Sequence, residues 1–425
     1  MNSKHSELIE PGSRVWTGVK SRVEYLRRLS VVFAFDLRIK IVTELYLREM
    51  SPKQFYEEFG GGSLPRVSRH FRKLAEHGWL EFIRSETGGN RRGATEHFYR
   101  APELAVIDNE TWALVPYSMR VAMSWRTFKI LAERVRDALK EGTLDARADS
   151  HLSWTSMVVD RLGWERIVAA VDAMFESIFE QQDAAKLRIS RSGEKPLVAT
   201  LALAAFESPH QEDSDSGRIP PRLVEVPKDP PFPLPLRVSK VFADELSLRI
   251  VTEANHREIS VPLFHAEFGG DSIKGIRRRF KTLERIGWLE QVNQKTGGRR
   301  RSAVERFFRA TGPAIFDRES WAEVPDSVKP TYSWTTFKLL AELVKEAIQA
   351  GTFEARLDSH LSWSVLRLDQ EGWERVAAAI DALLALILEE KDRARDRIAA
   401  SGEEAFTMTA ALAAFESPKD SSKEP

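Results

Sequence analysis

Basic side chains recur at helical spacing in one segment of the chain, and their types suit contact with a nucleic acid. Arg66, Arg69 and Lys73 fall on one side of a helical pattern, with Ser68 beside them. Guanidinium and ammonium groups neutralise phosphates, and arginine and serine also reach base edges in the major groove. These four residues therefore predict a DNA-contacting helix surface.

A second surface of the same kind lies in the second half of the chain. Its candidates are Lys274, Arg277, Arg278 and Lys281. Each helical segment is followed by a Gly-rich turn with cations at its tip, namely Arg91 and Arg92 in the first turn and Arg299, Arg300 and Arg301 in the second. Glycine permits the positive φ angles of a tight turn, and arginines there suit contact with the DNA backbone or minor groove.

The net charge conceals these two basic surfaces. The chain has 63 Lys and Arg against 63 Asp and Glu, so its formal net charge is zero. Between Leu64 and Ala101, however, eight basic residues face four acidic ones, and between Ile273 and Ala310 twelve face three. Local patches decide binding more than the total charge does, so a nucleic-acid partner remains compatible with a neutral chain.

Catalytic and metal chemistry is not indicated. The chain has no cysteine, no HExxH or GxSxG motif and no Gly-rich phosphate loop. His151 and His360 recur within Arg-x-Asp-Ser-His-Leu-Ser-Trp, but no second histidine stands at ligand spacing. Neighbouring residues of one strand also point to opposite faces, which opposes a triad. We expect two structural histidines, no metal or cofactor, and no enzyme activity.

Aromatic residues offer an alternative site for a small molecule. The candidate pocket residues are Trp125, Trp154, Trp164, Trp334, Trp363 and Trp373. Trp164 begins a wide apolar stripe on a long helix, and such a stripe favours core packing and an interface between the two halves. A ligand pocket, which would make the chain a one-component sensor, stays open as the second interpretation.

The elements that must position the basic side chains are three short helices and a hairpin. Residues 32–47 predict an amphipathic helix, and Ser51-Pro52 starts a second one that ends at Gly60-Gly61-Gly62. Ser63 can cap a third helix to about His77. Strands follow at 79–84 and 97–100, so the segment predicts a helix-turn-helix with a hairpin wing.

The remainder of each half alternates helix and strand. In the first half we expect a helix at 128–139, a strand at 151–160, a long helix from Gly163 and a strand at 197–206. This pattern predicts an α+β domain for dimerisation or for an effector.

The whole unit occurs twice in the chain. Residues 33–209 align with 242–418 without a gap, and 88 of the 177 paired positions are identical. A repeat this long is a protomer fused to its copy, and because most oligomers are two-fold symmetric, we expect a monomer that acts as an intramolecular pseudo-dimer. The segment 210–236, with seven prolines, predicts a linker.

The segments Phe33–Ile41 and Ser63–Leu74, with Gly78-Trp79-Leu80, resemble the winged helix of ArsR-type bacterial transcription regulators. The resemblance implies DNA binding, with the third helix in the major groove. It places Arg66, Ser68 and Arg69 at the bases, and Arg91 and Arg92 on the backbone. The second copy departs from the pattern, since Lys274 through Arg279 replaces Pro65 through His70 and Ser247 replaces Arg38.

Together these features predict an α+β protein of five parts. They are a winged helix-turn-helix at 25–104, an α+β domain at 110–209, the linker at 210–236, a second winged helix-turn-helix at 237–313 and a second α+β domain at 319–418. We expect a cytoplasmic transcription regulator that binds double-stranded DNA and not a membrane, with a small-molecule effector left open. A protein-interaction scaffold that binds no DNA is the alternative.

Overall fold

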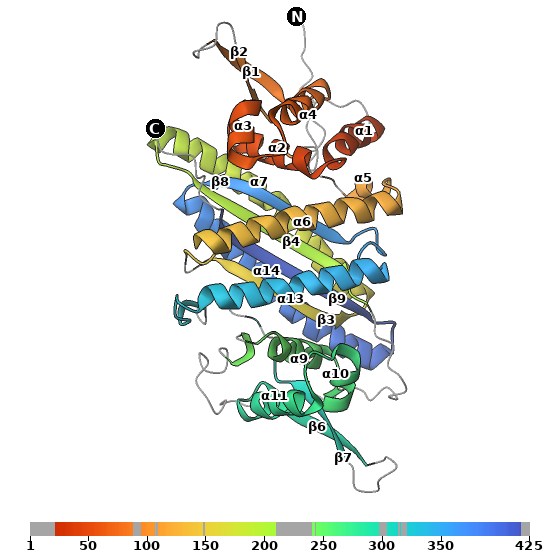
Figure 1. Cartoon of the computed structure of the whole chain (residues 1–425). Helices are drawn as coiled ribbons and strands as arrows, with labels where there is room; N and C mark the ends of the chain where they lie inside the picture. Colours follow the sequence, from red (N-terminus) through yellow and green to blue (C-terminus); the bar gives the residue numbers. More distant parts are fainter. Residues whose placement is uncertain are drawn as a thin grey trace, which may run out of the picture. The chain divides into compact units, whose positions relative to one another are not determined.

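The computed structural model describes residues 22–87, 95–105, 107, 109–147, 149–209, 240–242, 244–296, 304–312, 315 and 321–417. They form two compact units, the first with the described residues up to Ile130 and the second with those from Leu131 onward. Helices are combined with antiparallel sheets, which confirms the α+β class (Figure 1). The expected linker, 210–236, lies outside the described residues.

The first unit contains four helices followed by a hairpin. Its elements are α1 (Arg22–Phe33), α2 (Asp36–Leu47), α3 (Pro52–Phe59), α4 (Leu64–Glu76), β1 (Glu81–Thr87), β2 (Thr95–Arg100), α5 (Asn109–Ala113) and the start of α6 (Tyr117–Glu141). The prediction of one helix over 32–47 is wrong in one respect. The helix is interrupted at Phe35, whose backbone is extended (φ −144°, ψ 132°), so α1 ends at Phe33 and α2 begins at Asp36. Carbonyls freed at the end of α1 accept from Arg38 and Arg126.

A tryptophan anchors the core of this unit. Trp79 is fully buried, and its indole Nε1 donates to the Arg28 carbonyl at 2.9 Å. Val67, Phe71 and Leu74 on the inner side of α4 are also buried. Burial of this stripe stabilises α4 against the other helices of the unit and leaves its opposite side exposed.

The second unit contains the matching helices and hairpin. They are α9 (Glu245–His256), β5 (Ile259–Ser260), α10 (Val261–Phe268), α11 (Ile273–Arg285), β6 (Leu289–Thr296) and β7 (Val304–Ala310). We call α2 through β2 the first helix–hairpin module and α9 through β7 the second. Helices α3 and α4 have the same lengths as α10 and α11 and begin at the aligned positions of the first half.

The rest of the second unit is built on one four-stranded sheet. The strands are β3 (His151–Val159), β4 (Leu197–Glu207), β8 (His360–Leu368) and β9 (Phe406–Glu416), in the order β3-β9-β4-β8. Strands from the two halves alternate, so the separate α+β domains predicted at 110–209 and 319–418 share a single sheet. Local patterns in the sequence predict strands but not partners from the other half of the chain, which is why this arrangement was missed.

The strand pairing in the sheet is symmetric between the two halves of the chain. Leu203 of β4 lies opposite Leu412 of β9, its own counterpart in the second half. His151 pairs with Ala414, and the equivalent pair, Ala205 with His360, lies across the sheet. In an isologous interface, if position i of one copy contacts position j of the other, then position j of the first copy also contacts position i of the second. The strand pairs of this sheet follow that rule.

Helices cover both faces of this sheet. In Figure 1, α13 (Lys329–Ala350) crosses in front of the sheet, whereas α7 (Arg161–Ser192) and α14 (Gln370–Ser401) run behind it. The long helix α7 begins just before the expected Gly163 and includes the charged segment that follows the apolar stripe. Its stripe, from Trp164 to Ile178, is buried, in agreement with core packing.

Two reciprocal ion pairs join α7 and α14. Asp160 caps α7 through the Gly163 amide at 2.8 Å and binds Arg397 of α14 at 2.6 and 2.7 Å. At the other end, Asp369 caps α14 and binds Arg188 of α7 at 2.5 and 2.9 Å. Arginine side-chain bonds lower the pKa of both carboxyls, that of Asp369 to about 2. Each half therefore supplies one carboxylate and one guanidinium to the other.

Candidate nucleic-acid interface

The turn between α3 and α4 sets the position of the first basic helix. Ser51 caps α3, and its hydroxyl accepts from the Gln54 amide at 3.1 Å in a capping box. Gly61 has a φ of +113°, and a Cβ added there would lie 2.9 Å from Val67 Cγ2 and 3.2 Å from Leu37. Glycine is therefore required both for the backbone angle and for the close approach of the turn to α2.

The turn before α11 has the same construction. Ser260 caps α10 through the Leu263 amide at 3.2 Å, and Ser272 caps α11 through the Gly275 amide at 3.1 Å. A Cβ on Gly270 would lie 2.7 Å from Leu246. Both basic helices are thus held at their first turn by a serine cap and a glycine that fits against the preceding helix.

The outer side of α4 presents cations without counter-ions. Arg66, Arg69 and Arg72 are exposed, and their guanidinium groups form no ion pair with any described residue. Lys73 is also exposed but lies 3.3 Å from Glu76. Ser68 is half-buried beside them. The predicted cations are therefore brought together on one face, and Arg72 joins them.

The outer side of α11 is similar and carries more cations. Lys274, Arg277, Arg278 and Lys281 are all exposed, and none is paired with an acid in the parts of the chain that the structure describes. Arg279 differs, because Asp244 holds its guanidinium at 2.6 Å. A run of three arginines in the sequence thus contains two exposed cations and one internal ion pair.

The wing residues cannot be placed in the same way. Strands β1 and β2 form the expected hairpin, with a register shift between Phe82 and Arg84. The turn between them lies outside the described residues, and so do Arg91 and Arg92. The same holds for Arg299, Arg300 and Arg301 between β6 and β7. Their contact with a nucleic-acid backbone stays a prediction.

A contact that sequence reasoning missed lies on the inner side of α4. Arg38 of α2 donates from Nε to Nδ1 of His70 at 3.0 Å, and its guanidinium lies 4.7 Å from the Phe35 ring centre. His70 is 7% exposed. Burial and the positive charges of Arg38, Arg66 and Arg69 lower the pKa of His70. The imidazole is therefore held neutral, as an acceptor for Arg38.

The six candidate pocket tryptophans do not surround one cavity. Trp125 and Trp334 occupy equivalent places on α6 and α13 and are 43% and 45% exposed. Trp154 is buried and donates to the Thr336 carbonyl at 3.0 Å. Trp125 and Trp334 therefore share one kind of exposed position, whereas Trp154 lies in a different, buried one.

The other three tryptophans are covered by arginines from the opposite half. Arg356 lies 4.4 Å from the ring centre of Trp164, and the equivalent Arg147 lies 5.0 Å from Trp373. Trp363 is half-buried, with the Arg134 guanidinium 5.2 Å from its ring centre. Cation–π contacts of this kind account for the aromatic residues through packing between the halves.

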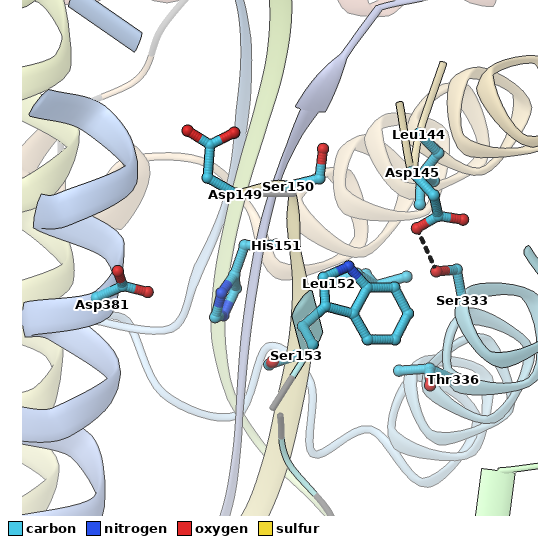
Figure 2. A pocket seen from close by; sticks show the side chains of 11 residues that line it. Leu144, Asp145, Asp149, Ser150, His151, Leu152, Ser153, Ser333, Thr336 and Asp381 are labelled. Atoms are coloured by element: carbon cyan, nitrogen blue, oxygen red, sulfur yellow. Dashed lines mark hydrogen bonds between the residues drawn. The ribbon is translucent and has the colours of Figure 1, made fainter. Parts of the chain in front are cut away.

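A small polar cavity lies beside the first histidine motif (Figure 2). Its volume is about 20 Å³, which is enough for one water molecule. Burial raises the pKa of Asp145 to about 6, although its Oδ1 accepts from Ser333 at 2.8 Å. Figure 2 shows the His151 ring on the side of Asp381 of α14. None of the six tryptophans lines this cavity.

No group of three or more histidine, aspartate or glutamate side chains among the described residues is placed to hold a metal ion. No helix in the described ranges is long and apolar enough to cross a membrane.

No family model, curated protein or solved structure matches this chain significantly. Its function must therefore be inferred from the site itself.

Proposed function

We propose that the chain is a cytoplasmic, DNA-binding transcription regulator that presents two non-identical recognition helices from one polypeptide. The helix–hairpin modules would act as ArsR-like winged helix-turn-helix domains. Helices α4 and α11 would enter the major groove, and the basic turns after β1 and β6 would contact the DNA backbone.

One observation carries this proposal: each module exposes a capped helix whose outer arginines have no acidic partner among the described residues. Many cations elsewhere on this protein are paired, as are Arg161 with Glu165 and Arg375 with Glu371. Unpaired cations on one helix face attract a polyanion without first breaking an ion pair. Their position on the second helix after a glycine turn is that of a recognition helix.

The shared sheet supports the single-chain pseudo-dimer. Its register and its reciprocal ion pairs relate the two halves as an isologous interface relates two subunits. The outward residues of the two basic helices nevertheless differ, for Arg66 corresponds to Gly275 and Ser68 to Arg277. We call the first module with its basic helix α4 the first head and the second module with α11 the second head. The two heads would therefore bind unlike half-sites, which an ordinary homodimer cannot do.

The alternatives have less support. A ligand sensor needs a cavity, and the tryptophans proposed for one are packed separately, while the cavity beside His151 holds about one water. A protein-interaction scaffold would need an acidic partner for two separate cationic helices. It remains the competing hypothesis for the experiment below.

The test is binding of the full chain to a labelled random DNA duplex at increasing KCl, followed by fluorescence anisotropy. If phosphate contacts dominate, the logarithm of the affinity falls linearly with the logarithm of salt, with a slope of about −0.9 per contact. We expect the triple variants R66A/R69A/R72A and R277A/R278A/K281A each to weaken binding by about tenfold or more and to reduce the slope.

The matched control removes three arginines from elsewhere on the surface. R136A/R161A/R375A changes the net charge by the same amount, and these side chains are 62%, 78% and 57% exposed. Its affinity should stay within about twofold of the unchanged chain, because these arginines lie outside α4 and α11 and each is already beside a carboxylate. Absence of binding at low salt, or equal losses in the control, would contradict the proposed function.

A further inference from the structure

The inner side of each basic helix rests on a small cluster that differs between the two modules. We call these residues the helix seats. The first seat contains Phe35, Arg38, Gly62 and His70, and the second contains, at the same aligned positions, Asp244, Ser247, Asp271 and Arg279. All four positions differ, although about half of the aligned residues of the two halves are identical.

In the first seat the cation comes from α2. The Arg38 guanidinium donates to the Val31 carbonyl at 2.8 Å and to the His70 ring at 3.0 Å. The rings of Phe35 and His70 lie 5.2 Å apart, and Phe35 also lies under the guanidinium. A neutral imidazole thus receives a hydrogen bond from a fixed cation.

In the second seat the cation comes from α11 instead. Arg279 donates from Nε to Asp244 at 2.6 Å and is also paired with Asp271. Asp244 caps α9 and accepts from the amide and hydroxyl of Ser247 at 3.2 and 2.6 Å. Each seat therefore holds one guanidinium, which comes from α2 in the first seat and from α11 in the second. Two carboxylates in the second seat take the place of the imidazole in the first.

The two seats respond differently to a proton. Protonation of His70 at Nδ1 removes the acceptor of Arg38 and places two cations in contact. In the second seat, burial opposes ionisation of Asp244, but its bonds to Arg279 and Ser247 lower its pKa overall, and bonds to Ser272 and Arg279 lower the pKa of Asp271. That seat therefore stays ionised in mild acid.

The surroundings of His70 strengthen this difference. The charges that act on the ring are Arg38 from α2 and Arg66 and Arg69 from α4 itself, and all three are positive. Asp36, beside Phe35 at the start of α2, is paired with Lys129 at 2.8 Å. An imidazolium would therefore meet like charges from both helices that pack around it.

We propose that the His70 seat makes DNA binding through α4 sensitive to mild acid, whereas the Arg279 seat leaves α11 insensitive over the same range. The proposal rests on the proposed DNA-binding function and adds its regulation: acidification weakens one head of the chain and spares the other. The folded protein favours neutral His70, so the pKa of His70 lies below the ordinary histidine value of about 6.5. The stabilising contact is therefore complete above pH 6.5 and is lost as pH falls through that lowered pKa.

The experiment isolates the first head by using the full chain with R277A/R278A/K281A. Its affinity for the random duplex is measured from pH 7.5 to 5.5 at constant ionic strength. Two changes remove the titrating seat. H70N keeps an acceptor for Arg38 that does not titrate, and F35D/R38S/H70R installs the second seat, with Gly62 retained because its φ of +94° favours glycine.

We expect the affinity of the R277A/R278A/K281A chain to fall by about fivefold towards the acid end of this range, which corresponds to the net contribution of one ordinary hydrogen bond. Both seat variants should change by less than about twofold. The other histidines of the chain are present in every variant, so their contributions cancel in the comparison. An equal fall in parent and variants would overturn the acid-sensitive seat while leaving DNA binding intact. Absence of binding at every pH would instead overturn the proposed DNA-binding function, and the role of the His70 seat would fall with it.

The complementary background, R66A/R69A/R72A, reports on the second head. Its affinity should change by less than about twofold over the same pH range. A fall as large as that of the first head would also overturn the proposal, because α11 has no imidazole in its seat. Unfolding by urea at both pH values verifies that each variant is folded.

Discussion

Replacing Asp160 by asparagine should remove one of the two ion pairs between α7 and α14 and so lower the free energy of unfolding. The Asp160 side chain is fully buried, whereas Arg397 is 27% exposed. Asparagine caps a helix about as well as aspartate does, so the Gly163 bond can survive while the charge is lost. The substitution therefore reports mainly on the ion pair, and D369N reports on its counterpart with Arg188.

The expected cost follows from the partners that remain. Breaking a buried ion pair by removal of one partner costs about 3–5 kcal/mol. Arg397 keeps Glu390 at 2.6 Å, and Arg188 keeps Glu371 at 3.4 Å, so neither guanidinium is left without a carboxylate. We therefore expect a cost at or just below the lower end of that range, about 2–3 kcal/mol, for each substitution, and nearly equal values for the two.

The assay is equilibrium unfolding in urea, with the slope of free energy against urea held common among variants. E165Q is the matched control, because it makes the same acid-to-amide change in an exposed pair with Arg161 and should cost less than about 0.5 kcal/mol. A loss in D160N as small as that of E165Q would refute the view that reciprocal ion pairs hold the halves together. So would a loss in one of D160N and D369N that is more than twice the loss in the other.

Three further predictions concern acid, the turn and the linker. Stability should fall as pH drops from about 4 towards 2, because Asp369 has its pKa lowered from 3.8 to about 2, and D369N should lose about 2 kcal/mol of this dependence in urea unfolding. G61A should destabilise the first unit by about 2–3 kcal/mol, whereas G193A, with open space around its Cβ position, should cost about 1 kcal/mol; melting curves compare them. Cleavage at a protease site inserted in 210–236 should leave one particle by light scattering, since strands of both halves alternate in the sheet; separation into half-size particles would contradict that sheet.

Much of each module could be predicted from the sequence, because its signals are local. Ser63 and the apolar residues Val67, Phe71 and Leu74 define α4 without knowledge of the remainder of the chain, and the structure places the helix there. The exposed cations follow from the same periodicity. The break at Phe35 was missed because the apolar pattern continues across it.

The shared sheet and the helix seats could not be predicted in the same way. Strand β3 begins at His151 and its partner β9 at Phe406, in the other half of the chain, and alternation within a strand does not name its neighbour. The Arg38–His70 contact joins two helices whose relative position is set by the turn at Gly61. The coordinated difference at Asp244 and Arg279 was visible in the aligned halves, but only the contacts explain why both positions changed.

Selection of preferred sequences from a random duplex library tests the central claim most directly. Because Arg66 and Ser68 on α4 correspond to Gly275 and Arg277 on α11, the full chain should enrich a site with two unlike half-sites. The R277A/R278A/K281A variant should lose the preference in one half-site and keep it in the other. Failure to enrich any sequence, or enrichment of a perfect palindrome, would contradict a single chain that reads DNA with two different helices.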